Sequence, residues 1–181
     1  MTMTKWVSLV AMLALASAGL VGAADAPDPA EVAKRLLKAH GAVAVAHKAR
    51  YGGGIDDMWL GYDEAGVPVT GVASRQTKTY AEALAMIAVT PADGVYKVVA
   101  AEIPTVGSFH GKSQSYAKDA LKDITGRVFE GSKEARGLVD AVSGATKYYK
   151  AIYVSYALMA SKVIEELKAK PDWPREPIAA E

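Results

Sequence analysis

The feature that most constrains the fold is the turn Pro91-Ala92-Asp93-Gly94, which separates apolar runs at residues 84–90 and 95–103. An Asp-Gly pair between two such runs is a strong short-range signal of a β-hairpin. The Ala and Met content of residues 84–90 is also compatible with a helix, and the turn favours a strand. Pro104 is expected to end the second strand of this hairpin.

Another hairpin is expected at residues 58–62 and 67–73, around the turn Asp63-Glu64-Ala65-Gly66. Pro68 has no backbone N–H, so it must begin a strand or lie in an edge strand. Two hairpins in succession indicate a small, mostly antiparallel sheet.

Helices are expected before and after the hairpins in the sequence. Asp28-Pro29-Ala30-Glu31 is typical of a helix start, and the helix is expected to continue to the glycines at 52–54, unless Gly41 divides it. A modest helix is predicted at residues 115–121. A long amphipathic helix is predicted after Thr146, with Pro171 ending it. The fold class is therefore α+β, a small mostly antiparallel sheet of two hairpins with flanking helices.

Two histidines, His40 and His47, would share one face of the first helix if it were continuous. Helical metal ligands are usually three or four residues apart, and these are seven apart. A surface or packing role is therefore favoured over metal binding.

The N-terminus has the features of a signal peptide. Lys5 is followed by an apolar stretch at residues 6–21 and by the small-residue site Val21-Gly22-Ala23. Cleavage near Ala23 would place the protein in the periplasm or another extracytoplasmic compartment, with an uncleaved membrane anchor as the alternative.

Composition narrows the possible functions. Removing Lys5 leaves 20 basic and 20 acidic residues, and this balance argues against nucleic acid as a partner. The chain has no cysteine, which excludes disulfides, thiolate metal sites and cysteine acylation. Its chemistry must depend on hydroxyls, carboxylates, histidines or a bound cofactor.

The stretch Asp140-Ala141-Val142-Ser143-Gly144-Ala145-Thr146 leads into the predicted long helix. A helix N-terminus offers free N–H groups and a partial positive charge, which suit a phosphate. Gly144 and Ala145 would allow a phosphate ester to approach the backbone closely. Ser143 or Thr146 is equally suited to be an ordinary N-cap, and local physics alone favours that simpler interpretation.

Upstream, Glu102-Ile103-Pro104-Thr105-Val106-Gly107 is expected to form a loop directly after a strand. Together, the two stretches resemble the FMN-binding domain family, which includes the flavinylated C subunit of the sodium-pumping NADH:quinone reductase and the G subunit of the Rnf complex. Members carry an acid-X-Pro loop and a later Asp-X-X-(Ser/Thr)-Gly-Ala-(Thr/Ser) motif. The chain departs from the family pattern at Ile103, where Thr is common, and at Thr105, where Gly is common.

The resemblance implies one covalent FMN, attached through a phosphoester to Thr146 by a separate flavin transferase. Ser143, Gly144 and Ala145 would surround the phosphate, and Asp140 would serve recognition by the transferase. Glu102, Thr105 and Gly107 would lie against the flavin ring. Tyr148 and Tyr149 either stack on that ring or pack in the core.

The function implied is an exported electron carrier that exchanges electrons with membrane or periplasmic partners, with no catalytic residues of its own. An extracytoplasmic flavin-dependent reductase, with His110 as a nearby proton donor, is one alternative. A binding module of the same fold without flavin is another. The corresponding domains are a signal peptide (1–23), an N-terminal helical segment (24–56), an FMN-binding domain (57–170) and a C-terminal tail (171–181).

Overall fold

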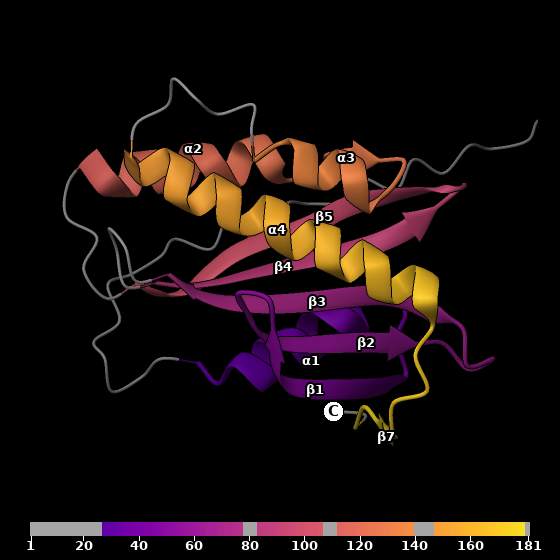
Figure 1. Cartoon of the computed structure of the whole chain (residues 1–181). Helices are drawn as coiled ribbons and strands as arrows, with labels where there is room; N and C mark the ends of the chain where they lie inside the picture. Colours follow the sequence, from indigo (N-terminus) through magenta and orange to yellow (C-terminus); the bar gives the residue numbers. More distant parts are fainter. Residues whose placement is uncertain (1–26, 78–82, 107–111, 140–146, 180–181) are drawn as a thin grey trace, which may run out of the picture.

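The computed structural model describes residues 27–77, 83–106, 112–139 and 147–179. These residues form one antiparallel sheet of seven strands, in the order β6-β5-β4-β3-β2-β1-β7, together with four helices (Figure 1). The elements are, in chain order, α1 (Pro29–Ala39), β1 (Ala44–Gly52), β2 (Ile55–Tyr62), β3 (Pro68–Thr77), β4 (Ala83–Ala92), β5 (Val95–Val106), α2 (Lys112–Ile124), β6 (Val128–Phe129), α3 (Ser132–Gly137), α4 (Lys147–Ala169) and β7 (Arg175–Pro177).

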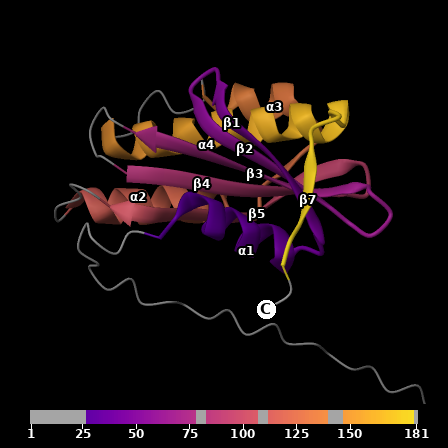
Figure 2. The same cartoon turned by 90° about the horizontal axis from the view of Figure 1, so that it is seen from below.

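An antiparallel sheet with helices packed on it confirms the α+β prediction. The sheet separates two apolar layers. α1 packs on one face of the sheet, and α3 and α4 cover the other (Figure 2). α2 packs beside α4 in the second of these apolar layers. Alternate residues of the same strand serve the two layers: on β2, Leu60 packs beneath α4, whereas Trp59 packs beneath α1. This alternation is the period-two pattern expected of a strand buried on both sides.

Both predicted hairpins are present. β2 pairs with β3 and β4 pairs with β5, and the second turn closes on the pair Ala92 and Val95. Asp93 and Gly94 have φ of 47° and 83°, the left-handed values that an Asp-Gly turn supplies at low cost. Pro68 is the first residue of β3, as its missing N–H requires.

The first helix is shorter than predicted, and this part of the prediction was wrong. α1 ends at Ala39, Gly41 turns the chain with φ of 85°, and residues 44–52 are strand β1 rather than a second helical piece. β1 pairs with β2 along most of its length. His40 therefore follows a helix and His47 lies in a strand, so the two do not share a helical face.

The C-terminal segment, predicted only as a tail, is extended and joins the sheet. β7 pairs with the start of β1, and Ile178 N–H donates to the carbonyl of Val43. The Arg175 guanidinium lies 3.9 Å from the ring centroid of the buried Tyr62. α4 ends just before Pro171, as predicted.

α4 is the longest helix, and a glycine sets its distance from the sheet. A Cβ at Gly71 of β3 would lie 2.4 Å from Cγ1 of Val163. A side chain at this position would require the Val163 side chain or α4 to shift. In the described part of the chain, no helix is long and apolar enough to cross a membrane. The signal-peptide prediction concerns residues 1–23, which lie outside the described residues.

Candidate functional site

Glu102 lies inside β5, which agrees with the predicted strand at residues 95–103 and corrects the prediction that 102–107 form a loop. β5 continues to Val106, two residues beyond the expected end at Pro104. The register pairs Glu102 with Met86 and Thr105 with Leu84, so the two residues between them on β5 stand opposite one residue of β4. This arrangement is a β-bulge, a feature that is common beside functional sites and that tolerates a proline.

The Glu102 end of β5 is an open edge among the described residues. β6 pairs only with Tyr96 and Lys97 at the other end of β5. The backbone of Val98 is hydrogen-bonded to Gly126 and Arg127. From Val98 toward Val106, no described strand pairs with that side of β5. An open edge presents backbone donors and acceptors that a ligand or another chain can use.

The backbone of Glu102 is tied to α4. The hydroxyl of Tyr156 donates to the carbonyl oxygen of Glu102 over 2.5 Å. Tyr156 is fully buried, and burial raises the pKa of its phenol well above the ordinary value. The phenol therefore stays a proton donor at neutral pH, and its bond fixes the position of α4 along β5.

The carboxylate of Glu102 is tied to the opposite layer. Nη2 of Arg35, on α1, donates to Oε2 of Glu102 over 2.5 Å. The Arg35 side chain is 58% exposed and that of Glu102 33%, so water screens the pair and its contribution to stability is below about 1 kcal/mol. Glu102 thus connects all three layers: its carbonyl contacts α4, its chain belongs to the sheet, and its carboxylate contacts α1.

α4 begins at Lys147, immediately after the predicted phosphate motif. Its first turn contains Lys147 and Lys150 and no acid, whereas α1 begins with the cap Asp28 and carries Glu31 in its first turn. A helix start favours negative charge nearby, and α4 supplies none from its own first turn. The start of α4 lies at the same end of the molecule as the end of β5 (Figure 1). Lys147 precedes Tyr156 by nine residues, about 14 Å along the axis.

A polar aromatic cluster flanks this start of α4. The hydroxyl of Tyr149 donates to Oδ2 of Asp123 on α2 over 2.6 Å. The Tyr149 ring stacks on that of Tyr153, with centroids 5.4 Å apart, and Arg127 lies 5.7 Å from the Tyr153 centroid. Burial and the bond to Asp123 raise the pKa of Tyr149. Tyr149 is partly buried and packs against the core, the more conservative of the two roles predicted for it.

Several predicted site residues remain untested. Thr105 is described only as part of the β5 backbone. The remaining predicted residues lie outside the described residues, namely Gly107, His110, Asp140, Ser143, Gly144, Ala145 and Thr146. The segments that contain them connect β5 to α2 and α3 to α4. The structure therefore describes the elements on either side of the candidate site and the contacts of Glu102.

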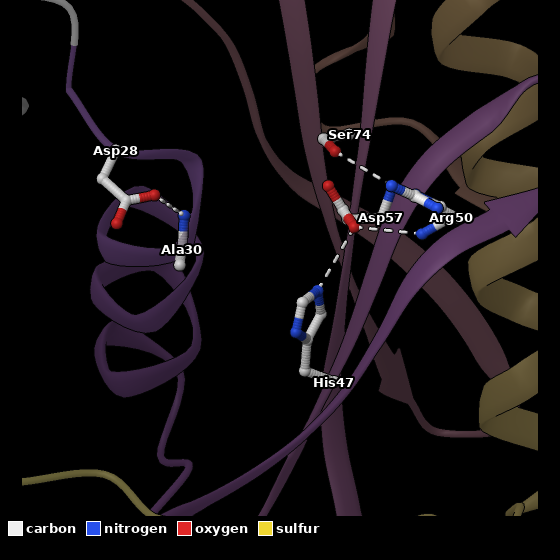
Figure 3. A network of polar contacts seen from close by, with 6 residues as sticks. All are labelled: Asp28, Ala30, His47, Arg50, Asp57 and Ser74. Carbon is white, nitrogen blue, oxygen red and sulfur yellow. Dashed lines mark hydrogen bonds and ion pairs between the residues drawn. The ribbon is translucent and has the colours of Figure 1, made fainter.

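A second polar network, drawn in Figure 3, was missed by sequence reasoning. Nε2 of His47 lies 3.4 Å from Oδ1 of Asp57, and this carboxylate also accepts from the backbone N–H of Arg50 over 3.2 Å. Ser74 Oγ accepts from the backbone N–H of Asp57 at 3.2 Å. The network resembles a Ser-His-Asp set in composition alone, because Ser74 is bonded to the backbone of Asp57 rather than to the histidine.

His47 has a packing role. Its ring stacks on that of Trp59 with centroids 4.8 Å apart and planes within 6°. In the described residues, no group of three or more histidine or carboxylate side chains is placed to hold a metal ion. His47 and Asp57 come together because β1 pairs with β2. The sequence analysis predicted a helix where β1 lies, so it could not place these two residues side by side.

Compared with models of protein families, with curated proteins and with solved structures, the chain matches none. A function must therefore be argued from the residues themselves.

Proposed function

We propose that the protein is an exported electron-transfer flavoprotein that carries one FMN, attached by a phosphoester to Thr146. The observation that carries the proposal is the start of α4. A 23-residue helix begins one residue after Thr146, and its first turn holds two lysines and no acid. A phosphate diester at Thr146 would add negative charge at a helix start whose own first turn has no acid.

The residues around that helix start fit a phosphate. Gly144 and Ala145 would leave room for it, and Ser143 would add a hydroxyl donor. Asp140 stands six residues before the attachment point, at a distance in sequence that suits recognition by the flavin transferase. The bound FMN would supply electron transfer, and the chain would tether it and orient its ring.

The ring end of the flavin is proposed to lie against the open edge of β5. The bulge at Ile103 and Pro104 interrupts regular pairing there, and the edge beyond Val98 has no strand partner among the described residues. Glu102, Thr105 and Gly107 would supply contacts from this strand and the segment after it. Lys147 precedes Tyr156 by about 14 Å along the axis of α4, and the Tyr156 hydroxyl contacts the carbonyl of Glu102.

An exported carrier of this kind needs a flavin transferase for maturation. It also needs a membrane or periplasmic electron donor and acceptor. A covalent tether has a physical reason in such a compartment, because a cofactor lost outside the cytoplasm is not recovered. His110, the proton donor on which the reductase alternative depends, lies outside the described residues.

Intact-mass spectrometry of the exported chain, coexpressed with a flavin transferase, tests the proposal. The expected mass is that of the mature chain plus one FMN less one water, and the protein is expected to be yellow. Thr146→Ala should abolish the increment, whereas Ser115→Ala, which removes an exposed hydroxyl on α2 and is the matched control, should retain it. A colourless chain of unmodified mass under these conditions would refute the attachment.

A further inference from the structure

A cleft of about 560 Å³ lies between the outer flank of α1 and the C-terminal segment, on the α1 face of the sheet. Figure 2 shows β7 passing beside the end of α1. The cleft has the volume of a small-molecule site. It is separate from the proposed attachment point at the start of α4, which packs on the opposite face of the sheet.

The lining of the cleft combines an apolar floor with cationic side chains. Val45 of β1 is buried, and Pro177 and Ile178 continue the floor along the C-terminal segment. Arg35 and Lys38 stand one turn apart on α1 and line one wall. A floor and wall of this kind suit a ligand with an apolar body and a negatively charged head.

Within the described residues, Lys34 and Arg35 of the cleft are ion-paired and Lys38 is not. Glu31 is already paired with Lys34 at 3.0 Å. Lys38 Nζ contacts only the carbonyl of Ala179, at 3.4 Å, and forms no ion pair with a carboxylate of the described residues.

Arg35 uses one nitrogen for Glu102, and a guanidinium has five N–H donors. Glu176 is the acid that opposes them: it is paired with Val45 in the β1–β7 register, so its side chain is on the same face. The lining carries three cations against two acids, and the carboxylate of Glu102, outside the lining, is paired with Arg35.

We propose that this cleft binds a small amphiphilic organic anion, with its carboxylate or sulfonate head between Arg35 and Lys38 and its apolar body on Val45 and Ile178. The site does not depend on flavin. It has one consequence for the rest of the molecule, because a head group that engages Arg35 competes with Glu102 for the same guanidinium. Occupancy of the cleft would thus be communicated to β5.

The test uses the mature chain without flavin and two fluorescent probes of matched shape. The anionic probe is 8-anilinonaphthalene-1-sulfonate, and the neutral probe is N-phenyl-1-naphthylamine. The sulfonate is expected to bind with a stoichiometry of one and to bind more tightly than the neutral amine. Octanoate should displace it, while inorganic sulfate at equal ionic strength should not, because sulfate lacks an apolar body.

Single-charge variants locate the binding. Lys38→Gln should weaken sulfonate binding by about three- to tenfold, the range of a charge-assisted hydrogen bond at a partly exposed site. Glu176→Gln should tighten it, since the opposing charge is removed. Lys122→Gln, an exposed lysine on α2, is the matched control and should leave the dissociation constant unchanged.

Circular dichroism and thermal unfolding check that each variant is folded. The proposal is overturned if the neutral amine binds as tightly as the sulfonate. It is also overturned if the folded Lys38→Gln and Lys122→Gln variants bind the sulfonate alike, or if Glu176→Gln fails to tighten binding.

Discussion

The packing of α4 on β3 can be tested at Gly71, because the structure leaves no room there for a methyl group. In Gly71→Ala, the new Cβ would lie 2.4 Å from Cγ1 of Val163 and 3.3 Å from Cδ2 of Leu60. Overpacking of this kind costs about 1–3 kcal/mol. Replacing glycine in a strand returns about 0.5–1 kcal/mol of backbone entropy. The net loss in the free energy of unfolding is therefore expected to be about 0–2.5 kcal/mol, with a middle value of about 1 kcal/mol.

The assay is urea unfolding of the mature chain, followed by circular dichroism. Val163→Ala alone should also destabilise, since Val163 is fully buried and its removal leaves a cavity. In the double variant the added and removed methyl groups occupy the same space, so its loss should be smaller than the sum of the single losses by about 0.5 kcal/mol or more. Strictly additive losses in the double variant would refute this placement of α4.

Three further predictions follow from the contacts of Glu102. Tyr156→Phe should cost about 1–3 kcal/mol in urea unfolding, because the carbonyl of Glu102 loses its donor beside a buried side chain; an unchanged midpoint would contradict the bond. Burial raises the pKa of Tyr156, so the stability gained from its neutral phenol is complete below about pH 10 and lost as pH rises further. Unfolding free energies measured between pH 9 and 11 should fall, and less steeply in Tyr156→Phe than in the wild type. Arg35→Gln should cost less than about 1 kcal/mol, because the ion pair is largely exposed, and a larger loss would mean that the pair is better shielded than its exposure indicates.

The two hairpins could be predicted because their signal is local. The Asp93-Gly94 turn takes left-handed backbone values that few residue pairs supply, and Pro68 can occupy only a few positions in a sheet. α4 could be predicted equally well, since its apolar face, its start after Thr146 and its end before Pro171 lie within one stretch of sequence. Local chemistry was sufficient in each case.

β1 was assigned to a helix because its identity depends on distant partners. Its second half is exposed and carries no clear alternation, so the sequence of residues 47–52 contains little strand signal. The strand forms because β2 pairs along one side of it and β7 along part of the other. β7 itself is a three-residue strand, too short for a periodic pattern.

The candidate site could be predicted only as motifs in the sequence, without their tertiary partners. The pairing of Arg35 with Glu102 joins residues 67 positions apart and follows from the packing of α1, which no local pattern specifies. The same is true of Tyr149 and Asp123, which come from two helices. The bulge at Pro104 could not be predicted from the sequence either, because it is defined by the register of β5 against β4.

The contacts of Glu102 bear on why an acid stands at this position. Tyr156 bonds the backbone carbonyl, which any residue would present, so this bond does not require glutamate. Arg35 does use the carboxylate, but the pair is exposed and contributes below about 1 kcal/mol. Neither contact makes an acid at 102 important for folding. A negative charge held at an open strand edge, and linked through Arg35 to a ligand-sized cleft, is better explained by binding than by stability.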